Sequence, residues 1–83
     1  MGLKIINFMK KYKMLDGKIF EATSSLDLIK QMRGDSLIPE GTLKAYMVSV
    51  SESSYYYNGS NINIDTYDHF VEDLISNGFI KVV

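Results

Sequence analysis

Residues 9–23 read MKKYKMLDGKIFEAT, and this stretch decides the fold. As strands, the runs on the two sides of Asp16-Gly17 alternate between two faces: Tyr12 and Met14 share one face before it, and Phe20 and Ala22 share one face after it. An Asp-Gly pair between two alternating runs is the strongest short-range hairpin signal, because both residues tolerate the positive φ of a type I′ turn. The pattern predicts a β-hairpin with strands at 10–15 and 18–23.

Two amphipathic helices are predicted after the hairpin. The first covers residues 25–33, with Ser24 as its N-cap and Gly34 in the left-handed position just past its end. The second begins after Thr42, carries an apolar stripe at helical spacing, and fades near Tyr57 because an Asn-Gly pair follows.

A short strand and a third helix are predicted next. Residues 61–65 alternate isoleucine with polar neighbours, which is typical of a strand. Thr66 can cap a helix that closes at Asn77-Gly78, where Phe79 is placed for the apolar contact of a glycine C-cap. The last residues, FIKVV, are β-prone and could add a final strand.

The element order ββααβα indicates an α+β fold, in which an N-terminal β-hairpin and a short third strand pack on three helices. We expect residues 9–83 to form a single domain, residues 34–41 to form a loop, and residues 1–8 to form a short N-terminal extension. The predicted core contains thirteen apolar side chains: Leu15, Phe20, Leu26, Ile29, Met32, Leu43, Met47, Val50, Ile64, Phe70, Val71, Leu74 and Phe79.

Composition excludes several classes of function. The 83 residues contain no cysteine and one histidine, which argues against disulfides, thiolate or histidine-rich metal sites and cysteine nucleophiles. We find no apolar run long enough for a membrane span and no secretory signal, so we expect a cytoplasmic protein. Glycine-rich phosphate loops and a Gly-x-Ser-x-Gly motif are missing, and we expect neither catalysis nor a cofactor.

Charge is unevenly distributed along the chain, although the net charge is −1. Basic residues concentrate in the first 33 positions, where hairpin lysines beside Tyr12 and Phe20 could contact phosphates and stack on a base. Lysines on exposed strands also protect against edge-to-edge aggregation, so we do not expect direct nucleic-acid binding but keep it as the alternative function. The lysines of this alternative are Lys10, Lys11, Lys13 and Lys18.

Acidic residues gather on the polar side of the third helix, where a solvated face is the ordinary interpretation and a surface for a basic partner is the functional one. Acids near the helix start also complement the helix dipole. His69 lies beside them, but too few ligands are at hand to hold a metal ion. The acids are Asp65, Asp68, Glu72 and Asp73.

Three consecutive tyrosines stand out within residues 53–61, SSYYYNGSN. Successive helical residues point about 100° apart, so at least one ring must lie outside the core. Tyrosine mixed with serine, glycine and asparagine is typical of recognition loops. The alternative is that Tyr57 and one neighbour complete the core of the second helix. We expect the binding surface to centre on Tyr55, Tyr56 and Asn58 and to extend across the acidic side of the third helix.

From Met9 onward the chain resembles small uncharacterised proteins of bacterial phages and conjugative elements. The resemblance rests on KYKMLDGKIFEATSSLDLIKQM, on AYM with Val50, and on FVEDLISNGFI. It implies an accessory protein of a mobile element, of a kind that often binds a host protein and includes inhibitors of host defence such as anti-CRISPR proteins. The expected partner is a host protein such as a nucleic-acid-handling enzyme, and the sequence leaves the oligomeric state open.

Overall fold

The hairpin forms as predicted, with a different turn. A computed structural model describes residues 9–34 and 42–83; the loop expected at 34–41 and the extension at 1–8 fall almost wholly outside these ranges. Strand β1 (Lys10–Met14) pairs antiparallel with β2 (Ile19–Ala22). The Met14 amide donates to the Lys18 carbonyl, and among loop residues 15–17 only Gly17 has positive φ, so the loop has three residues and is not a type I′ turn.

The third strand of the sheet comes from the end of the chain. Strand β3 (Ile80–Val82) pairs antiparallel with β1, which gives the order β2-β1-β3 and makes β1 the central strand. The segment 61–65, predicted to be a strand, is not one. Its backbone groups are bound by side chains instead: Ser51 donates to the Ile62 carbonyl, and the Asn63 amide donates to Asp73.

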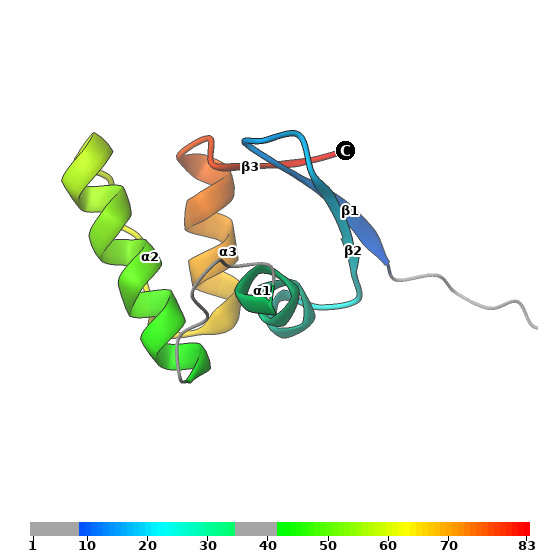
Figure 1. The fold of residues 1–83 in the computed structure, drawn as a ribbon, viewed down its shortest axis with the longest axis horizontal. Coiled ribbons are helices and arrows are strands. Elements are labelled where there is room, and N and C mark those ends of the chain that lie inside the picture. The colour runs from blue at the N-terminus through cyan, green and yellow to red at the C-terminus, as the bar shows by residue number, and fades with distance from the viewer. Residues whose placement is uncertain (1–8, 35–41) are drawn as a thin grey trace, which may run out of the picture.

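The three helices lie on one side of the sheet (Figure 1). Helix α1 (Ser25–Gly34) and helix α3 (Tyr67–Ser76) contact the strands, whereas α2 (Leu43–Asn58) contacts α1 and lies farthest from the sheet. The α1 N-cap is as predicted, because the Ser24 hydroxyl accepts from the Asp27 amide. Gly34 is the last residue of α1 and has no positive φ, so its predicted left-handed conformation is wrong.

Threonines cap the other two helices, as predicted. Thr42 accepts from the Ala45 amide and Thr66 from the His69 amide. At the end of α3, the Phe79 amide donates to the Leu74 carbonyl, and Phe79 packs half-buried against the core. This is the glycine C-cap with its apolar contact, and it turns the chain from α3 directly into β3.

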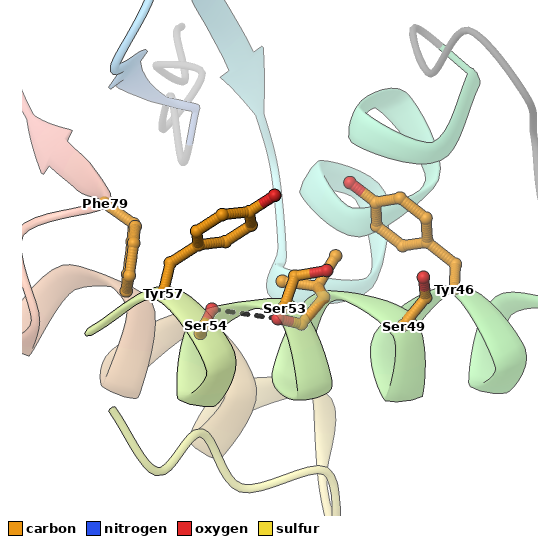
Figure 2. Close-up of a pocket in the computed structure, with 7 residues that line it drawn as sticks. Tyr46, Ser49, Ser53, Ser54, Tyr57 and Phe79 are labelled. Atoms are coloured by element: carbon orange, nitrogen blue, oxygen red, sulfur yellow. Dashed lines mark hydrogen bonds between the residues drawn. The ribbon is translucent and has the colours of Figure 1, made fainter. Parts of the chain in front are cut away.

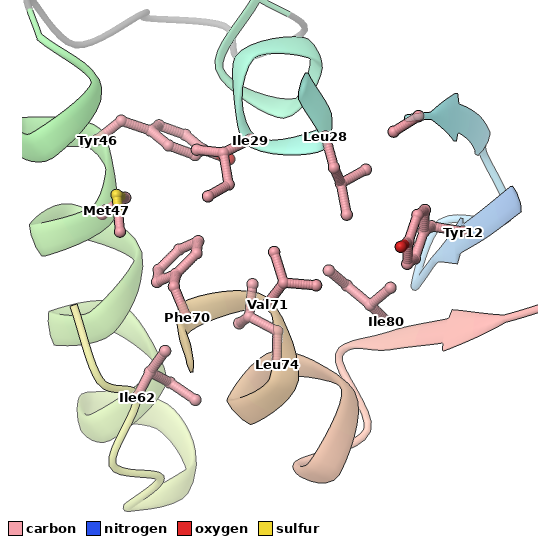
Figure 3. Close-up of a cluster of buried hydrophobic side chains, with 11 residues drawn as sticks. Tyr12, Leu28, Ile29, Tyr46, Met47, Ile62, Phe70, Val71, Leu74 and Ile80 are labelled. Atoms are coloured by element: carbon pink, nitrogen blue, oxygen red, sulfur yellow. The ribbon is translucent and has the colours of Figure 1, made fainter. Parts of the chain in front are cut away.

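The core lies between the sheet, α1 and α3, and continues to α2 (Figure 3). Leu15 was predicted to be in the core and is 74% exposed, because β1 ends at Met14 and Leu15 belongs to the loop. In α1 the fully buried leucine is Leu28, whereas Leu26 is only half-buried. The buried apolar set is Tyr12, Ala22, Leu28, Ile29, Tyr46, Met47, Ile62, Phe70, Val71, Leu74 and Ile80.

Candidate functional site

All three consecutive tyrosines are exposed at the C-terminal end of α2. Tyr55 is 62% exposed, Tyr56 85% and Tyr57 82%. The prediction that at least one ring lies outside the core is therefore confirmed, and the alternative that Tyr57 and a neighbour complete the core is wrong. Ser54 takes the core-facing position of this turn: it is 6% exposed, and its hydroxyl donates to the Val50 carbonyl.

The rings project in different directions around the helix. Tyr56 and Tyr57 meet edge to face, with ring centroids 5.9 Å apart and planes at 83°. Tyr55 follows Ser51 by four residues and therefore lies on the same side of α2, the side on which Ser51 binds Ile62. We define Tyr55, Tyr56, Tyr57 and the exposed Asn58 as the tyrosine cluster; it covers more than one side of the helix end.

The turn that carries the tyrosine cluster is firmly terminated. Gly59 has φ of 70° and donates its amide to the Tyr55 carbonyl at 2.7 Å, and the Ser60 amide donates to the Ser54 carbonyl at 3.3 Å. These bonds satisfy carbonyls that a frayed helix end would leave to water. The rings are therefore presented from an ordered helical turn.

An open hollow of about 350 Å³ lies beside Tyr57, between α2 and Phe79, which follows the C-cap of α3 (Figure 2). Sequence reasoning missed this hollow, although Tyr46, Val50, Ser53 and Tyr57 recur at helical spacing and so lie along one side of α2. Its lining offers hydroxyl groups and apolar carbons but no charged side chain. The lining residues are Tyr46, Ser49, Val50, Ser53, Ser54, Tyr57 and Phe79.

The four acids of the predicted surface differ in what they bind. The Asp73 carboxylate accepts two bonds of 2.8 Å from Asn63, one from its backbone and one from its side chain, and so holds the 61–65 segment against α3. Asp65 accepts from the Thr66 amide and binds His69. Asp68 and Glu72 are exposed and form no ion pair with a described residue. Only these two carboxylates are available to attract a basic partner without breaking an internal bond.

His69 and Asp65 form an exposed pair across one helical turn. The His69 Nδ1 atom lies 3.0 Å from Asp65 Oδ2. Hydrogen bonding to the Asp65 carboxylate raises the pKa of His69, and the same bond lowers the pKa of Asp65. Within the ranges 9–34 and 42–83, no three acidic or histidine side chains are grouped closely enough to hold a metal ion.

The basic hairpin does not form the predicted stacking surface. Tyr12 is 7% exposed and faces the helices, and Phe20, its cross-strand partner, is half-buried on the same face. Lys10 shares that face at the start of β1, whereas Lys11 and Lys13 lie on the opposite one. Lys18 lies next to the turn. The burial of Tyr12 therefore rules out base stacking on that ring, while phosphate contacts by the hairpin lysines stay a prediction.

Comparison with protein-family models, with curated proteins and with solved structures finds no match to this chain. None of the helices in the described ranges is both long enough and apolar enough to cross a bilayer. Function must therefore be argued from the surface itself.

Proposed function

We propose that this chain is a non-enzymatic protein-binding module that contacts its partner through the tyrosine cluster. The observation that carries the proposal is the exposure of three adjacent rings at the end of a helix whose core-facing position is filled by a serine. Tyrosine offers a large contact area at a low cost in side-chain entropy, and it is enriched among the residues that dominate binding energy.

Rigid presentation supports this role. Binding is penalised when side chains and loops must be ordered at the interface. The Gly59 cap and the bond from Ser51 to Ile62 already fix the end of α2 before any partner arrives. The open hollow beside Tyr57 gives a partner side chain a place to insert next to an aromatic anchor.

The exposed acids of α3 favour a partner with a positively charged surface. Asp68 and Glu72 add exposed negative charge that no described residue neutralises. Exposed charges of this kind act mainly on the association rate and its salt dependence, while buried aromatic anchors supply most of the affinity. A partner with a basic surface, such as a nucleic-acid-handling enzyme, fits this arrangement.

The biological setting is part of the same proposal. We propose that the chain acts in the cytoplasm of a bacterial host, as an accessory protein that inhibits a host defence system in the manner of anti-CRISPR proteins; the resemblance to small phage and conjugative-element proteins supports this setting. The basic channel of a nucleic-acid-handling host enzyme would then be the surface that Asp68 and Glu72 approach.

The first experiment is capture of a partner from a bacterial lysate, with and without nuclease treatment. Affinity for the captured protein is then measured for the Tyr55→Ala/Tyr56→Ala variant. We expect a loss of about thirtyfold or more, because truncating a binding hot spot costs at least about 2 kcal/mol. Tyr67→Ala, which removes an exposed tyrosine from the start of α3, is the matched control and should bind normally.

A second pair of variants tests the acids. Glu72→Lys should slow association and weaken its salt dependence, whereas Glu21→Lys makes the same charge change on β2 and should not. Asp68→Lys/Glu72→Lys should have the larger effect. Full affinity in both the tyrosine and the acid variants, with circular dichroism unchanged, would exclude this surface. Capture that disappears after nuclease treatment would instead favour the alternative, nucleic-acid binding by the hairpin.

A further inference from the structure

The register of the sheet places two lysines directly opposite each other. Lys13 on β1 and Lys81 on β3 are cross-strand partners, and both are exposed. Their neighbours Tyr12 and Ile80 are buried against the helices. Because successive strand residues point to opposite faces, Lys13 and Lys81 share the face of the sheet that the helices leave uncovered.

No acid among the described residues lies directly opposite either member of this pair of like charges. Side chains of directly opposed residues begin about 5 Å apart, and like charges in that position destabilise the sheet. On β2, Lys13 faces Ile19, whereas the acid Glu21 faces Lys11. Neither Lys13 nor Lys81 forms an ion pair with a described residue. Within the ranges 9–34 and 42–83, Lys13 and Lys81 are therefore two adjacent cations without an ion-pair partner.

Two ordinary explanations do not account for the pair. Lysines that discourage aggregation belong on edge strands, which explains Lys81 on the edge strand β3 but not Lys13 on the central strand. Lysines can also bind the free carbonyls at a helix end. At the end of α3, however, the Leu74 and Ile75 carbonyls already accept the amides of Phe79 and Gly78.

Both lysines line one concave site. A hollow of about 250 Å³ lies where strands β1 and β3 meet the residues after α3. Figure 1 shows the paired strands β1 and β3 side by side. Leu15 and Phe79 give it an apolar wall. The site therefore combines paired cations with carbon surface, and this second hollow differs from the uncharged one beside Tyr57.

We propose that Lys13 and Lys81 bind the phosphate group of a phosphate monoester in this hollow. A phosphate monoester carries a charge of about −1.5 to −2 at neutral pH, which matches two ammonium groups. Lysine is a common phosphate ligand, which it binds as a point charge, and two lysines can share the oxygens of one phosphate. Leu15 and Phe79 would contact the organic part of the ligand. The site is independent of the tyrosine cluster and of the proposed partner.

The test is a titration followed by amide resonances of the full chain. Inorganic phosphate and adenosine monophosphate are added at constant ionic strength, with chloride as reference. We expect saturable shifts confined to residues 13–15 and 78–81. Lys13→Gln and Lys81→Gln should each weaken binding about tenfold, the loss of one charged contact. Lys10→Gln, on the other face of β1, is the control and should titrate like the parent protein.

A stability measurement gives a second readout. At low ionic strength without phosphate, Lys81→Gln should melt at a higher temperature than the parent, because the opposed charges are gone. Phosphate should then raise the melting temperature of the parent more than that of the variant, beyond its general stabilising effect. Unsaturable shifts, or equal shifts in the parent and both glutamine variants, would overturn the proposal. Binding of a single-stranded oligonucleotide without terminal phosphates, in the absence of phosphate binding, would also overturn it and indicate a nucleic-acid surface.

Discussion

Helix α3 and the C-terminal end of α2 use their aromatic and apolar residues in opposite ways. The ten residues of α3 bury Phe70, Val71 and Leu74 almost completely. The last turn of α2 buries only Ser54 and leaves three tyrosines outside. Both segments are ordered helices with satisfied caps, so the difference lies in packing and not in helix formation.

Position in the fold explains this contrast. Helix α3 lies among the strands, α1 and the 61–65 segment, so its apolar side is covered. Helix α2 is the outermost layer and contacts α1. Stability is therefore concentrated in α3, while the end of α2 is free to vary in sequence or to bind. The predictions below test this division.

The largest expected effect is at Phe70. Phe70→Ala removes a completely buried ring from the side of α3 that faces the core. The free energy of unfolding should fall by about 3–5 kcal/mol, a large share of what so small a domain has. Chemical denaturation measures the change. Tyr56→Ala removes a ring of similar size from α2 and should alter stability by no more than about 0.5 kcal/mol. Equal losses in the two variants would contradict the division.

Asp73 should give the next largest effect, because it links α3 to the segment that also binds α2. Asp73→Ala breaks two bonds from Asn63 and releases an extended segment that has no strand partner. We expect a loss of about 1–2 kcal/mol, since bonds to a charged group are partly offset by solvent at this half-exposed position. Asp68→Ala, which breaks no such bond, should be close to neutral by the same denaturation assay.

The helix caps allow a finer comparison of the two regions. Thr66→Ala removes the hydroxyl that accepts the His69 amide at the start of α3, and should cost about 1 kcal/mol. Thr42→Ala removes the equivalent bond at the start of α2. If α2 is held less tightly, hydrogen exchange in Thr42→Ala should accelerate mainly within α2, whereas Thr66→Ala should accelerate exchange in α3, α1 and the sheet. Identical exchange patterns would show that the two helices unfold as one unit.

The smallest expected effect depends on pH. Folding raises the pKa of His69, so the contribution of His69 to stability is complete at pH values below its pKa in the unfolded chain. This contribution is lost as the pH rises through the pKa of His69 in the folded protein. The lowered pKa of Asp65 means that its contribution is lost at the acid end, as pH falls through its folded value. The free energy of unfolding of the parent should therefore exceed that of His69→Gln by the most between about pH 4 and pH 6.5. Chemical denaturation of both proteins at about pH 5.5 and pH 8.5 measures the difference in stability between the parent and the variant. A difference that is the same at both pH values would contradict the prediction.

Local signals predicted most of the elements, because each rests on neighbouring residues. The Asp-Gly hairpin, the three caps at Ser24, Thr42 and Thr66, and the end of α3 before Gly78 are confirmed. The wrong predictions concern contacts between residues that are far apart in the sequence. The alternation at 61–65 describes any extended segment with one buried side, and only the bonds from Ser51 and to Asp73 reveal that side chains replace a neighbouring strand there.

The sequence predicted those features of the candidate site that follow from the geometry of a single helix. Three consecutive tyrosines must leave a ring outside, and that follows from helix periodicity alone. The engagement of Asp73 by Asn63 and the pairing of Lys13 with Lys81 depend on contacts between separate elements. Leu15 was misplaced for a related reason, because a one-residue change in the hairpin loop moves it from the strand to the turn.

The pairing of β1 with β3 has a consequence for the order of folding. The bridge between β1 and β2 closes a loop of three residues, whereas the bridge from Met14 to Ile80 closes almost the whole domain. Closing that larger loop costs chain entropy before the β3 contacts stabilise the fold. Such long-range pairing is therefore slow. The hairpin, α1 and the helix caps can form early from nearby residues. We therefore expect the central strand to gain its second neighbour only after the helices have brought the two ends of the domain together.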